Sequence, residues 1–274
     1  MIVVTAAGGS TGTAVVRELR SRGQEVRAVV GTPRARPELD GLGAEVVVGD
    51  LVGDPAGLPL ADADALYLIW PNFEPTEGAG APTAFRAARD AGVGRVVYHS
   101  VLRPQLRAMP HHAAKDRAEE ALDAAGVPWR GLQPCAYADN LDAALRTAAE
   151  TGELRSAWGV RQAQSLGDLR DVAAAAAVLL TEDGLDGGTF EAVGPERLTA
   201  PDVAAAMAAH LGRPVTAVDT RAPEQDSYAG RCLRTMFEHY RAHGFTGSPR
   251  VLTDLLGRPP RSYAEHLADL GDPA

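Results

Sequence analysis

Three side chains near the middle of the chain have the types and spacing that suit proton transfer and the holding of a hydroxylated ligand. They are Ser100, His111 and Lys115. Histidine has an unperturbed pKa near ~6.5 and can exchange a proton at neutral pH. Lysine offers a compact cation to a ribose or a phosphate, and serine can orient a substrate oxygen. These three residues are the candidate catalytic group.

The lysine stands out because it is the single lysine among 27 basic residues. At ~100° per residue, His111 and Lys115 share one narrow apolar stripe of a predicted helix. A lysine in such a stripe is unfavourable unless a negative or hydrogen-bonding group meets it, and a bound ribose with its phosphates is one such group. Two alternatives stay open. For Lys115, the alternative is an ordinary surface ion pair with Glu119. For His111, the alternative is that it is only an N-terminal helix residue.

A glycine-rich turn at the start of the chain is the second candidate site. Residues 6–12 are small, and they stand between an apolar run at 2–5 and a segment of helical composition at 13–20. Glycines there let a pyrophosphate approach the backbone, and the free N–H groups of the first helical turn attract negative charge. The segment therefore predicts a dinucleotide site, with a bare tight turn between strand and helix as the alternative.

The elements that position these residues alternate along the chain. Strands are expected at 2–5, 25–30, 45–48, 64–69, 95–99, 129–133 and 189–193, and helices at 13–20, 83–91, 111–125, 140–150 and 168–180. This alternation predicts an α/β fold with a Rossmann-type, doubly wound parallel sheet. From residue 196 the pattern is mostly helical. We therefore expect a core domain at 1–195 and a small C-terminal lobe at 196–274 that shapes the substrate pocket.

Composition excludes several classes of protein. A net charge of −9 argues against a nucleic-acid surface, so any role on DNA would need a protein partner. No window approaches the ~20 apolar residues of a membrane span, and the first apolar run is too short for a signal peptide. Cys135 and Cys232 stand alone, which predicts a reducing cytoplasm and no metal site. Heavy use of arginine and alanine fits a high-GC bacterial source.

Several motifs together resemble the NmrA-like group of atypical short-chain dehydrogenases/reductases. They are the opening turn, Ser100 with the His111…Lys115 pair, and the segments at 49–51, 98–101, 132–134, 170–173 and 257–260. The resemblance spans nearly the whole chain and implies an NAD(P)-binding Rossmann core. Members of the group are NAD(P)H-dependent reductases of quinones, enones or similar acceptors, or non-catalytic redox sensors that bind a partner protein.

The resemblance also assigns roles to individual residues. The family's G-x-x-G-x-x-G turn falls on Ala6, Gly9 and Gly12, so its first glycine is an alanine here. Classical short-chain dehydrogenases/reductases place a tyrosine four residues before the lysine that holds the nicotinamide ribose; here that position is His111. Ser100 matches the serine that orients the substrate oxygen. The implied cofactor contacts are Ala6, Gly9, Ser10, Thr11, Gly12, Arg34, Asp50, Leu51, Lys115 and Pro134.

The end of the second strand bears on the choice of cofactor. Relatives often carry an arginine there to hold the 2′-phosphate of NADP, whereas this chain has Val30-Gly31-Thr32-Pro33 and no acidic residue either. Arg34 or Arg36 could reach a 2′-phosphate, helped by Ser10 and Thr11. NADP(H) is therefore expected as the preferred cofactor, and NAD(H) stays possible.

The substrate pocket is expected at the ends of two strands, from Trp70, Asn72, Phe73, Cys135 and Tyr137. Aromatic side chains gathered there favour a flat, conjugated small molecule, although Trp70 and Tyr137 could equally be packing residues. The function expected is NAD(P)H-dependent reduction of a small carbonyl, enone or quinone-like substrate, with the proton from His111. The alternatives are a non-redox isomerase, cyclase or lyase on the same fold, and a non-catalytic NAD(P)-sensing regulator.

Overall fold

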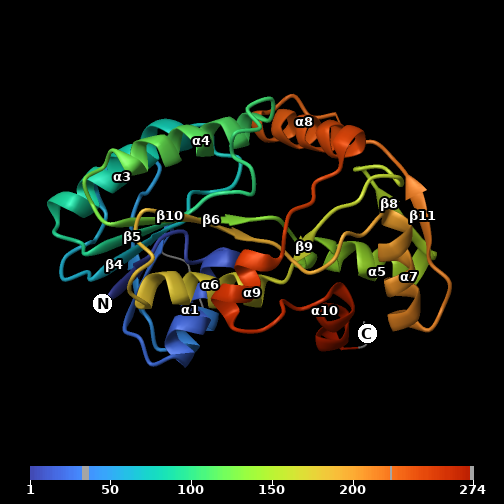
Figure 1. Cartoon of the computed structure of the whole chain (residues 1–274), viewed down its shortest axis with the longest axis horizontal. Coiled ribbons are helices and arrows are strands. Elements are labelled where there is room, and N and C mark those ends of the chain that lie inside the picture. The colour runs from blue at the N-terminus through green and yellow to red at the C-terminus, as the bar shows by residue number, and fades with distance from the viewer. Residues whose placement is uncertain (33–36, 223, 272–274) are drawn as a thin grey trace. The chain divides into compact units, whose positions relative to one another are not determined.

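A seven-stranded parallel sheet organises the first part of the chain (Figure 1). The computed structural model describes residues 1–32, 37–222 and 224–271. In chain order the strands are β1 (Ile2–Val4), β2 (Val26–Val30), β3 (Glu45–Val48), β4 (Ala65–Leu68), β5 (Arg95–His99), β6 (Trp129–Pro134) and β10 (Gly188–Ala192). Their order across the sheet, β10-β6-β5-β4-β1-β2-β3, reverses direction between β1 and β4. The Rossmann-type fold predicted from the sequence is confirmed.

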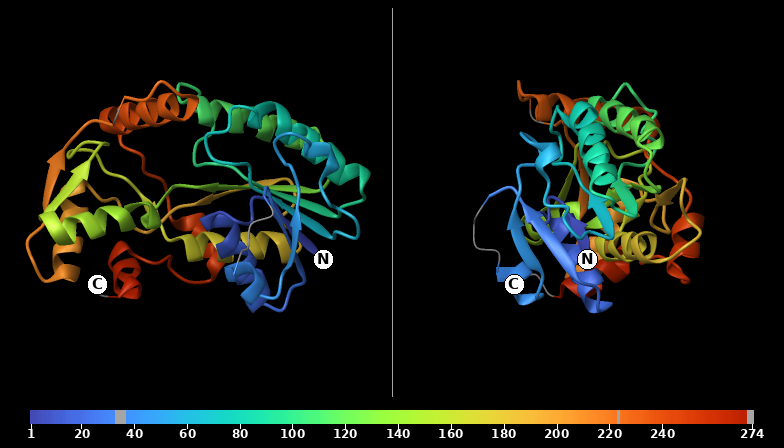
Figure 2. Two further views of the ribbon diagram at one scale, coloured as in Figure 1. Left: turned by 180° about the vertical axis from the view of Figure 1, so that it is seen from behind. Right: turned by 90° about the vertical axis from the view of Figure 1, so that its left-hand side faces the viewer.

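Helices cover both faces of this sheet. α3 (Glu77–Asp90) and α4 (Pro110–Asp123) lie side by side on one face, while α1 (Ser10–Ser21) and α6 (Leu169–Thr181) lie on the other (Figures 1 and 2). β1 and β4 are continuous apolar runs, because the middle of a parallel sheet is buried on both faces. The short helix α2 (Pro37–Gly41) and the 3₁₀ turn η1 (Pro55–Gly57) complete this part.

The chain divides into two compact units. The first is Met1–Gln133 with Val172–Phe190, and the second is Pro134–Asp171 with Glu191–Ala274. The second unit contains α5 (Asp142–Thr151), α7 (Ala200–Leu211), α8 (Tyr228–His243), α9 (Arg250–Leu256), α10 (Tyr263–Leu270) and the 3₁₀ turn η2 (Ala138–Leu141). It also contains two pairs of parallel strands, β8 (Glu153–Ser156) with β11 (Thr216–Asp219) and β7 (Ala136–Tyr137) with β9 (Leu166–Gly167). The domain boundary expected at residue 195 stays a prediction.

One buried carboxylate fixes the C-terminal segment within the second unit. Asp171 is fully buried, and one oxygen accepts a hydrogen bond of 2.6 Å from the Arg258 guanidinium. The Arg261 guanidinium pairs with this same oxygen, and the other oxygen accepts the Arg261 backbone N–H at 2.6 Å. The two segments at 170–173 and 257–260 that carried part of the family resemblance therefore meet in space.

Helix α3 is longer than the sequence predicts. It begins at Glu77, six residues before the predicted start, although residues 77–82 contain two glycines and Pro82. Glycine and proline are the weakest helix formers, so their presence favoured a loop. Packing overrides that preference, since a Cβ at Gly80 would lie 2.3 Å from the Trp70 ring. Only a glycine lets the helix lie that close to the indole.

Candidate functional site

The turn after β1 presents an uncapped helix N-terminus. Gly9 is the N-cap of α1, no side chain caps the helix there, and its first turn carries no acidic residue. The exposed Gly9 backbone is therefore next to N–H groups whose partial positive charge favours an anion. Gly12 allows the helix to pack on the strand, because a Cβ there would lie 2.5 Å from the Ala6 carbonyl oxygen and 2.6 Å from Ala7 Cα.

Ala6 makes the tight turn that glycine makes in the family pattern. Its φ of +46° is in the left-handed region, which costs an L-residue about 1–2 kcal/mol. Two hydrogen bonds of 3.0 Å hold the turn, from Gly9 N–H to the Ala6 carbonyl and from Ala7 N–H to the Val29 carbonyl. Ala6 therefore adopts the backbone conformation that glycine adopts in such a turn, and this conformation is locally strained.

The structure describes only some of the residues expected to contact the adenosine half of the cofactor. The Asp50 carboxylate accepts a hydrogen bond from Gly53 N–H at 2.8 Å and so closes its own turn after β3. Leu51 is buried in the core of the first unit. Arg34 and Arg36, the candidate 2′-phosphate contacts, lie outside the described residues.

Lys115 lies in a buried polar network between α3 and α4. Its Nζ donates to Glu77 Oε1 at 2.7 Å and to the His99 carbonyl oxygen at 3.0 Å. The Tyr98 hydroxyl donates to the same Glu77 oxygen at 2.8 Å, and Lys115 Nζ lies 5.4 Å from the centre of the Tyr98 ring. The negative group that meets Lys115 is therefore Glu77 rather than Glu119. Glu77 was not among the predicted site residues, because the helix was expected to begin only at residue 83.

The lysine is not fully enclosed by this network. The side chain of Lys115 is 12% exposed, against 4% for Glu77. An ammonium group has three N–H donors, so two donors in the hydrogen bonds above leave one for a ligand. Burial, followed by the charge of Glu77, raises the pKa of Tyr98 well above its usual value, which keeps its hydroxyl as a donor to the carboxylate.

His111 is a buried, neutral histidine. Its ring packs edge-to-face on Phe73 at 5.2 Å and on His112 at 4.6 Å, and it is 7% exposed. Burial, followed by the charges of His112 and Lys115, lowers its pKa to about 3. The expectation that His111 carries an ordinary pKa near ~6.5 is wrong, because the helical stripe on which it lies is buried. Its Nδ1 is buried without a hydrogen-bond partner among the described residues.

Ser100 follows β5 and lies next to Glu119 of α4. It is 2% exposed, and its N–H donates to the Leu132 carbonyl at 2.8 Å. Its Oγ makes no hydrogen bond of regular geometry within the described chain, but it is near enough to Glu119 to favour the ionised carboxylate. The Gln133 amide Nε2 contacts both Glu119 oxygens, at 2.9 and 3.0 Å. Burial raises the pKa of Glu119, and the nearby Ser100 and Gln133 side chains oppose that effect.

The model of the NmrA-like family matches residues 1–244. The chain belongs to the NmrA-like family. The resemblance inferred from the sequence motifs is thus confirmed over the Rossmann core and much of the C-terminal part.

Several proteins are similar to this NmrA-like chain over almost their whole length. A (4-alkanoyl-5-oxo-2,5-dihydrofuran-3-yl)methyl phosphate reductase of Streptomyces griseus subsp. griseus is 33% identical, over 98% of this chain and 97% of that protein. An NAD(P)H azoreductase of Xenophilus azovorans is 29% identical, over 99% of each chain. The structure of an NADPH-dependent quinone oxidoreductase from Escherichia coli has a TM-score of 0.83 and 25% identity, and the match covers 98% of this chain and 99% of that one.

The residues expected to line a substrate pocket fall into different surroundings in the NmrA-like chain. Phe73 is brought together with His111, and Asn72 is exposed nearby in sequence. Trp70 is 2% exposed and belongs to the core of the first unit. Pro134, Cys135 and Tyr137 belong to the second unit, where burial raises the pKa of Cys135 to about 11. The pocket role of these residues stays a prediction.

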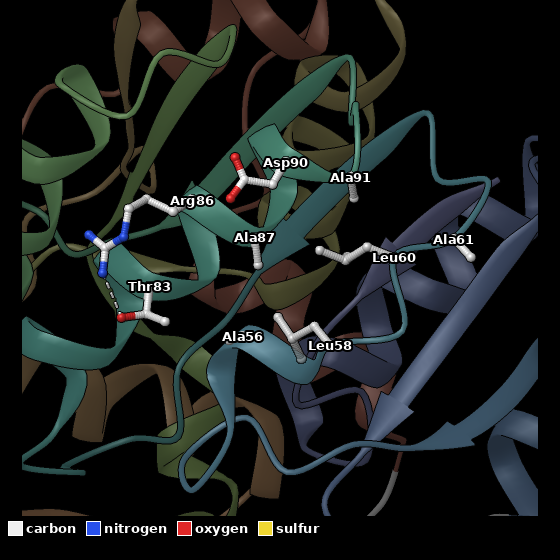
Figure 3. Close-up of a pocket in the computed structure, with 9 residues that line it drawn as sticks. All are labelled: Ala56, Leu58, Leu60, Ala61, Thr83, Arg86, Ala87, Asp90 and Ala91. Atoms are coloured by element: carbon white, nitrogen blue, oxygen red, sulfur yellow. Dashed lines mark hydrogen bonds between the residues drawn. The ribbon is translucent and has the colours of Figure 1, made fainter.

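A cavity of about 580 Å³ lies elsewhere on the first unit (Figure 3). Leu58 and Leu60 line it from the segment around η1, and Thr83, Arg86 and Asp90 line it from α3. These residues lie in the part of α3 that precedes the amino end of β5 in the chain. Ligands of doubly wound sheets bind instead at the carboxyl ends of the strands. The cavity is therefore separate from the candidate site.

In the part of the chain that the structure describes, no cluster of His, Cys, Asp or Glu suits a metal ion, and no helix is long and apolar enough to cross a membrane.

Proposed function

We propose that this protein is an NAD(P)H-dependent reductase of a small, conjugated carbonyl, enone or quinone-like acceptor. The observation that carries the proposal is the uncapped N-terminus of α1 at Gly9, on the same sheet edge as Ser100, His111 and Lys115. The names of the relatives support it, since they include an azoreductase, a quinone oxidoreductase and a reductase of an unsaturated lactone phosphate. A cytoplasmic location is part of the proposal, in line with a chain that has only two cysteines, both of them buried.

The residues at the carboxyl edge fit a dinucleotide. The N–H groups at Gly9 and Ser10 and the hydroxyl of Thr11 would hold the pyrophosphate. The remaining N–H of Lys115 would reach ribose hydroxyls. Because Glu77 already balances the charge of Lys115, this contact suits a neutral hydroxyl better than a phosphate. The nicotinamide supplies a hydride when bound.

Ser100 and His111 would act on the oxygen of the acceptor. Because His111 is neutral at pH 7, it would donate a hydrogen bond to the developing oxyanion rather than act as an imidazolium acid. Ser100 would orient the same oxygen from the end of β5. A preference for NADP(H) over NAD(H) rests on Arg34, Ser10 and Thr11 and is part of the proposal.

The decisive experiment separates cofactor binding from folding with the variant Gly9→Ala. A Cβ at Gly9 would meet the protein only at 3.5 Å, at the Ala6 carbonyl oxygen, so the variant should fold normally. The same methyl group would stand where the pyrophosphate approaches, so NADPH affinity measured by calorimetry should fall at least tenfold. Ser21→Ala, at the far end of α1, is the matched control and should bind as the wild type does.

Turnover is then measured with NADPH and NADH on a panel of a quinone, an enone and an azo dye. Oxidation of the cofactor by one class of acceptor supports the proposal. Failure to bind either nucleotide at millimolar concentration contradicts it. Tight binding without turnover on the whole panel contradicts the reductase and favours a nucleotide-sensing regulator.

A further inference from the structure

The ammonium group of Lys115 is held in one orientation by two hydrogen bonds. Its Nζ donates to Glu77 Oε1 at 2.7 Å and to the His99 carbonyl oxygen at 3.0 Å. Neither acceptor is free to move, since the carbonyl belongs to the last residue of β5 and the Glu77 side chain is only 4% exposed. An ammonium group has three N–H donors in a fixed geometry, so two hydrogen bonds also set the direction of the third donor.

Glu77 is held as firmly as the lysine that it faces. The Tyr98 hydroxyl donates at 2.8 Å to the same Oε1 that accepts from Lys115. The Tyr98 ring is fully buried and packs edge-to-face on Phe85, with 5.5 Å between the ring centres. Glu77 is also the first residue of α3, where the partial positive charge of a helix N-terminus is favourable to a carboxylate. The carboxylate oxygen that meets Lys115 therefore has a fixed position.

The first turn of α3 lies directly against the turn of α4 that contains Lys115 (Figure 1). A Cβ at Gly78 would lie 2.9 Å from Arg117 Nε and 3.4 Å from the Ala114 carbonyl oxygen. A bulky side chain at Gly78 would therefore push the two helices apart. Glycine is a poor helix former, so its use next to Glu77 favours close approach over helix stability. The contact between Glu77 and Lys115 depends on this approach.

The stability of the fold does not require a charged pair at this position. Taking a carboxylate and an ammonium group out of water costs free energy that their attraction only roughly offsets, so an apolar pair of similar volume is often as stable or more stable. Lys115 is also the single lysine among 27 basic residues, and its side chain stays 12% exposed. The pair is therefore better explained by the N–H that it presents to a ligand.

We propose that Glu77 is the positioning residue of the cofactor site, which fixes Lys115 and neutralises its charge so that the remaining N–H binds a ribose hydroxyl and not a phosphate. This inference rests on the proposed reductase function and adds a residue to it. Glu77 does not touch the cofactor in this scheme and acts only through Lys115.

The charge of the pair explains the preference for a hydroxyl. A lone ammonium group attracts the most negative group within reach, which in a dinucleotide is a phosphate. An ammonium group paired with a carboxylate carries no net charge, and what remains is one directional hydrogen-bond donor. Glu77 thus keeps Lys115 from competing with the N-terminus of α1 for the pyrophosphate.

The first arm of the test observes Lys115 in the nucleotide-free protein. Because the chain has one lysine, lysine labelled with ¹⁵N at Nζ gives a single ammonium signal that needs no assignment. Glu77→Asp keeps the charge but withdraws the carboxylate by about 1.5 Å, the length of one C–C bond. Exchange of the Nζ protons with water should be at least about tenfold faster in this variant, because a hydrogen bond to a charged group is lost. An unchanged exchange rate overturns the role of Glu77 in fixing the lysine.

The second arm measures the affinities for NADPH and for adenosine 2′,5′-bisphosphate by calorimetry. The second ligand has the adenosine half of NADPH and lacks the nicotinamide ribose. Glu77→Asp should weaken NADPH binding at least about tenfold, since a misplacement of about 1 Å is sufficient for such a loss, and should leave the bisphosphate unchanged. Glu120→Asp, the same exchange at an exposed position of α4, should bind both ligands as the wild type does. Equal loss of both ligands in Glu77→Asp, or loss of neither, overturns the positioning role.

Glu77→Gln tests the charge of the pair separately from its geometry. The amide leaves Lys115 with an uncompensated positive charge, so inorganic phosphate should displace NADPH at about tenfold lower concentration than in the wild type. Displacement at the same concentration contradicts the neutralising role of Glu77.

Tyr98→Phe keeps the proposal testable if the Glu77 variants do not fold. It keeps the buried ring and removes only the hydroxyl that donates to Glu77. Exchange at Nζ should become faster and the affinity for NADPH should fall about threefold, with the adenosine bisphosphate unchanged. A variant that matches the wild type in both measurements overturns the proposal. Absence of NADPH binding to the wild-type protein contradicts the reductase itself, and the exchange rates still decide whether Glu77 fixes Lys115.

Discussion

Lys115 and Glu77 form a buried ion pair, with 2.7 Å between Nζ and Oε1, that joins helix α4 to helix α3. The two residues lie 38 positions apart in the chain. The pair explains how a lysine is accommodated on the buried stripe of α4, and it orients the ammonium group toward the end of β5 through the His99 carbonyl. The position of Lys115 thus depends on a residue outside its own helix.

Breaking this pair from either side should destabilise the protein. Glu77→Gln and Lys115→Met should each lower the free energy of unfolding by about 3 kcal/mol, because each leaves an uncompensated buried charge. The double variant should lose clearly less than the sum. Urea unfolding at pH 7 measures all four proteins. Strictly additive losses would mean that the two side chains do not interact.

Two buried histidines should make the first unit sensitive to acid. The pKa of His99 and that of His111 are both about 3 in the folded protein, mainly because of burial. The unfolded chain binds these protons near ~6.5, so stability is full above that pH and falls as pH drops from ~6.5 toward ~3. At pH 4.5 each histidine should account for about 2.5–3 kcal/mol of loss relative to pH 7.5.

The variant His111→Phe isolates the contribution of one of these histidines. Its free energy of unfolding should fall less between pH 7.5 and 4.5 than that of the wild type. In wild-type NMR spectra the ring signals of His111 should not titrate between pH 5 and 8. A titration midpoint inside that interval would restore His111 as an ordinary acid.

The opening turn should respond in opposite directions to two exchanges of glycine and alanine. Gly12→Ala should lower stability by about 2 kcal/mol, since the new Cβ would lie 2.5 Å from backbone that cannot move cheaply. Ala6→Gly relieves a left-handed φ and should be neutral or stabilising by up to about 1 kcal/mol. Ala205→Gly, on an exposed turn of α7, should lose about 0.5–1 kcal/mol as the control. An Ala6→Gly loss equal to the control would argue against strain at Ala6.

A second histidine site should give the opposite pH dependence in the second unit. His266 of α10 contacts Asp168 Oδ2 through Nδ1 at 3.2 Å and Asp142 Oδ1 through Nε2 at 2.9 Å, so both ring nitrogens donate. Burial acts to lower the pKa of His266, but these two hydrogen bonds outweigh it and raise the pKa to about 9. The stabilisation that charged His266 gives the folded protein is complete below the unfolded pKa of ~6.5, and it is lost as pH rises through about 9.

The variant His266→Gln tests the two hydrogen bonds that His266 makes to Asp142 and Asp168. Between pH 6.5 and 9.5 the wild type should lose on the order of 2 kcal/mol more stability than the variant. Thermal unfolding of both proteins at a series of pH values measures this difference. Parallel curves for the two proteins would show that His266 is not charged in the folded state.

The fold was accessible from the sequence because strands and helices alternate with strong apolar patterns. The glycine turn at its start was equally clear, since Gly9 and Gly12 stand between a buried strand and a helix. The site was accessible only in part. The apolar stripe correctly indicated that Lys115 needs a partner. Glu77 was not predicted as that partner, because the glycines and the proline around it become helical only through tertiary packing. The low pKa of His111 was not predicted, because it depends on the extent of burial in the folded chain and on the nearby charges of His112 and Lys115.

The three donors that converge on Asp171 set a condition on the synthesis of the chain. Arg258 follows Asp171 by 87 residues, and Arg261 follows it by 90. While the chain emerges from the ribosome, this carboxylate has to stay hydrated until those arginines are made, because burying it unpaired would be strongly unfavourable. The start of α6 therefore reaches its buried environment only after almost the whole chain has been translated, because Arg258 and Arg261 lie close to its C-terminal end.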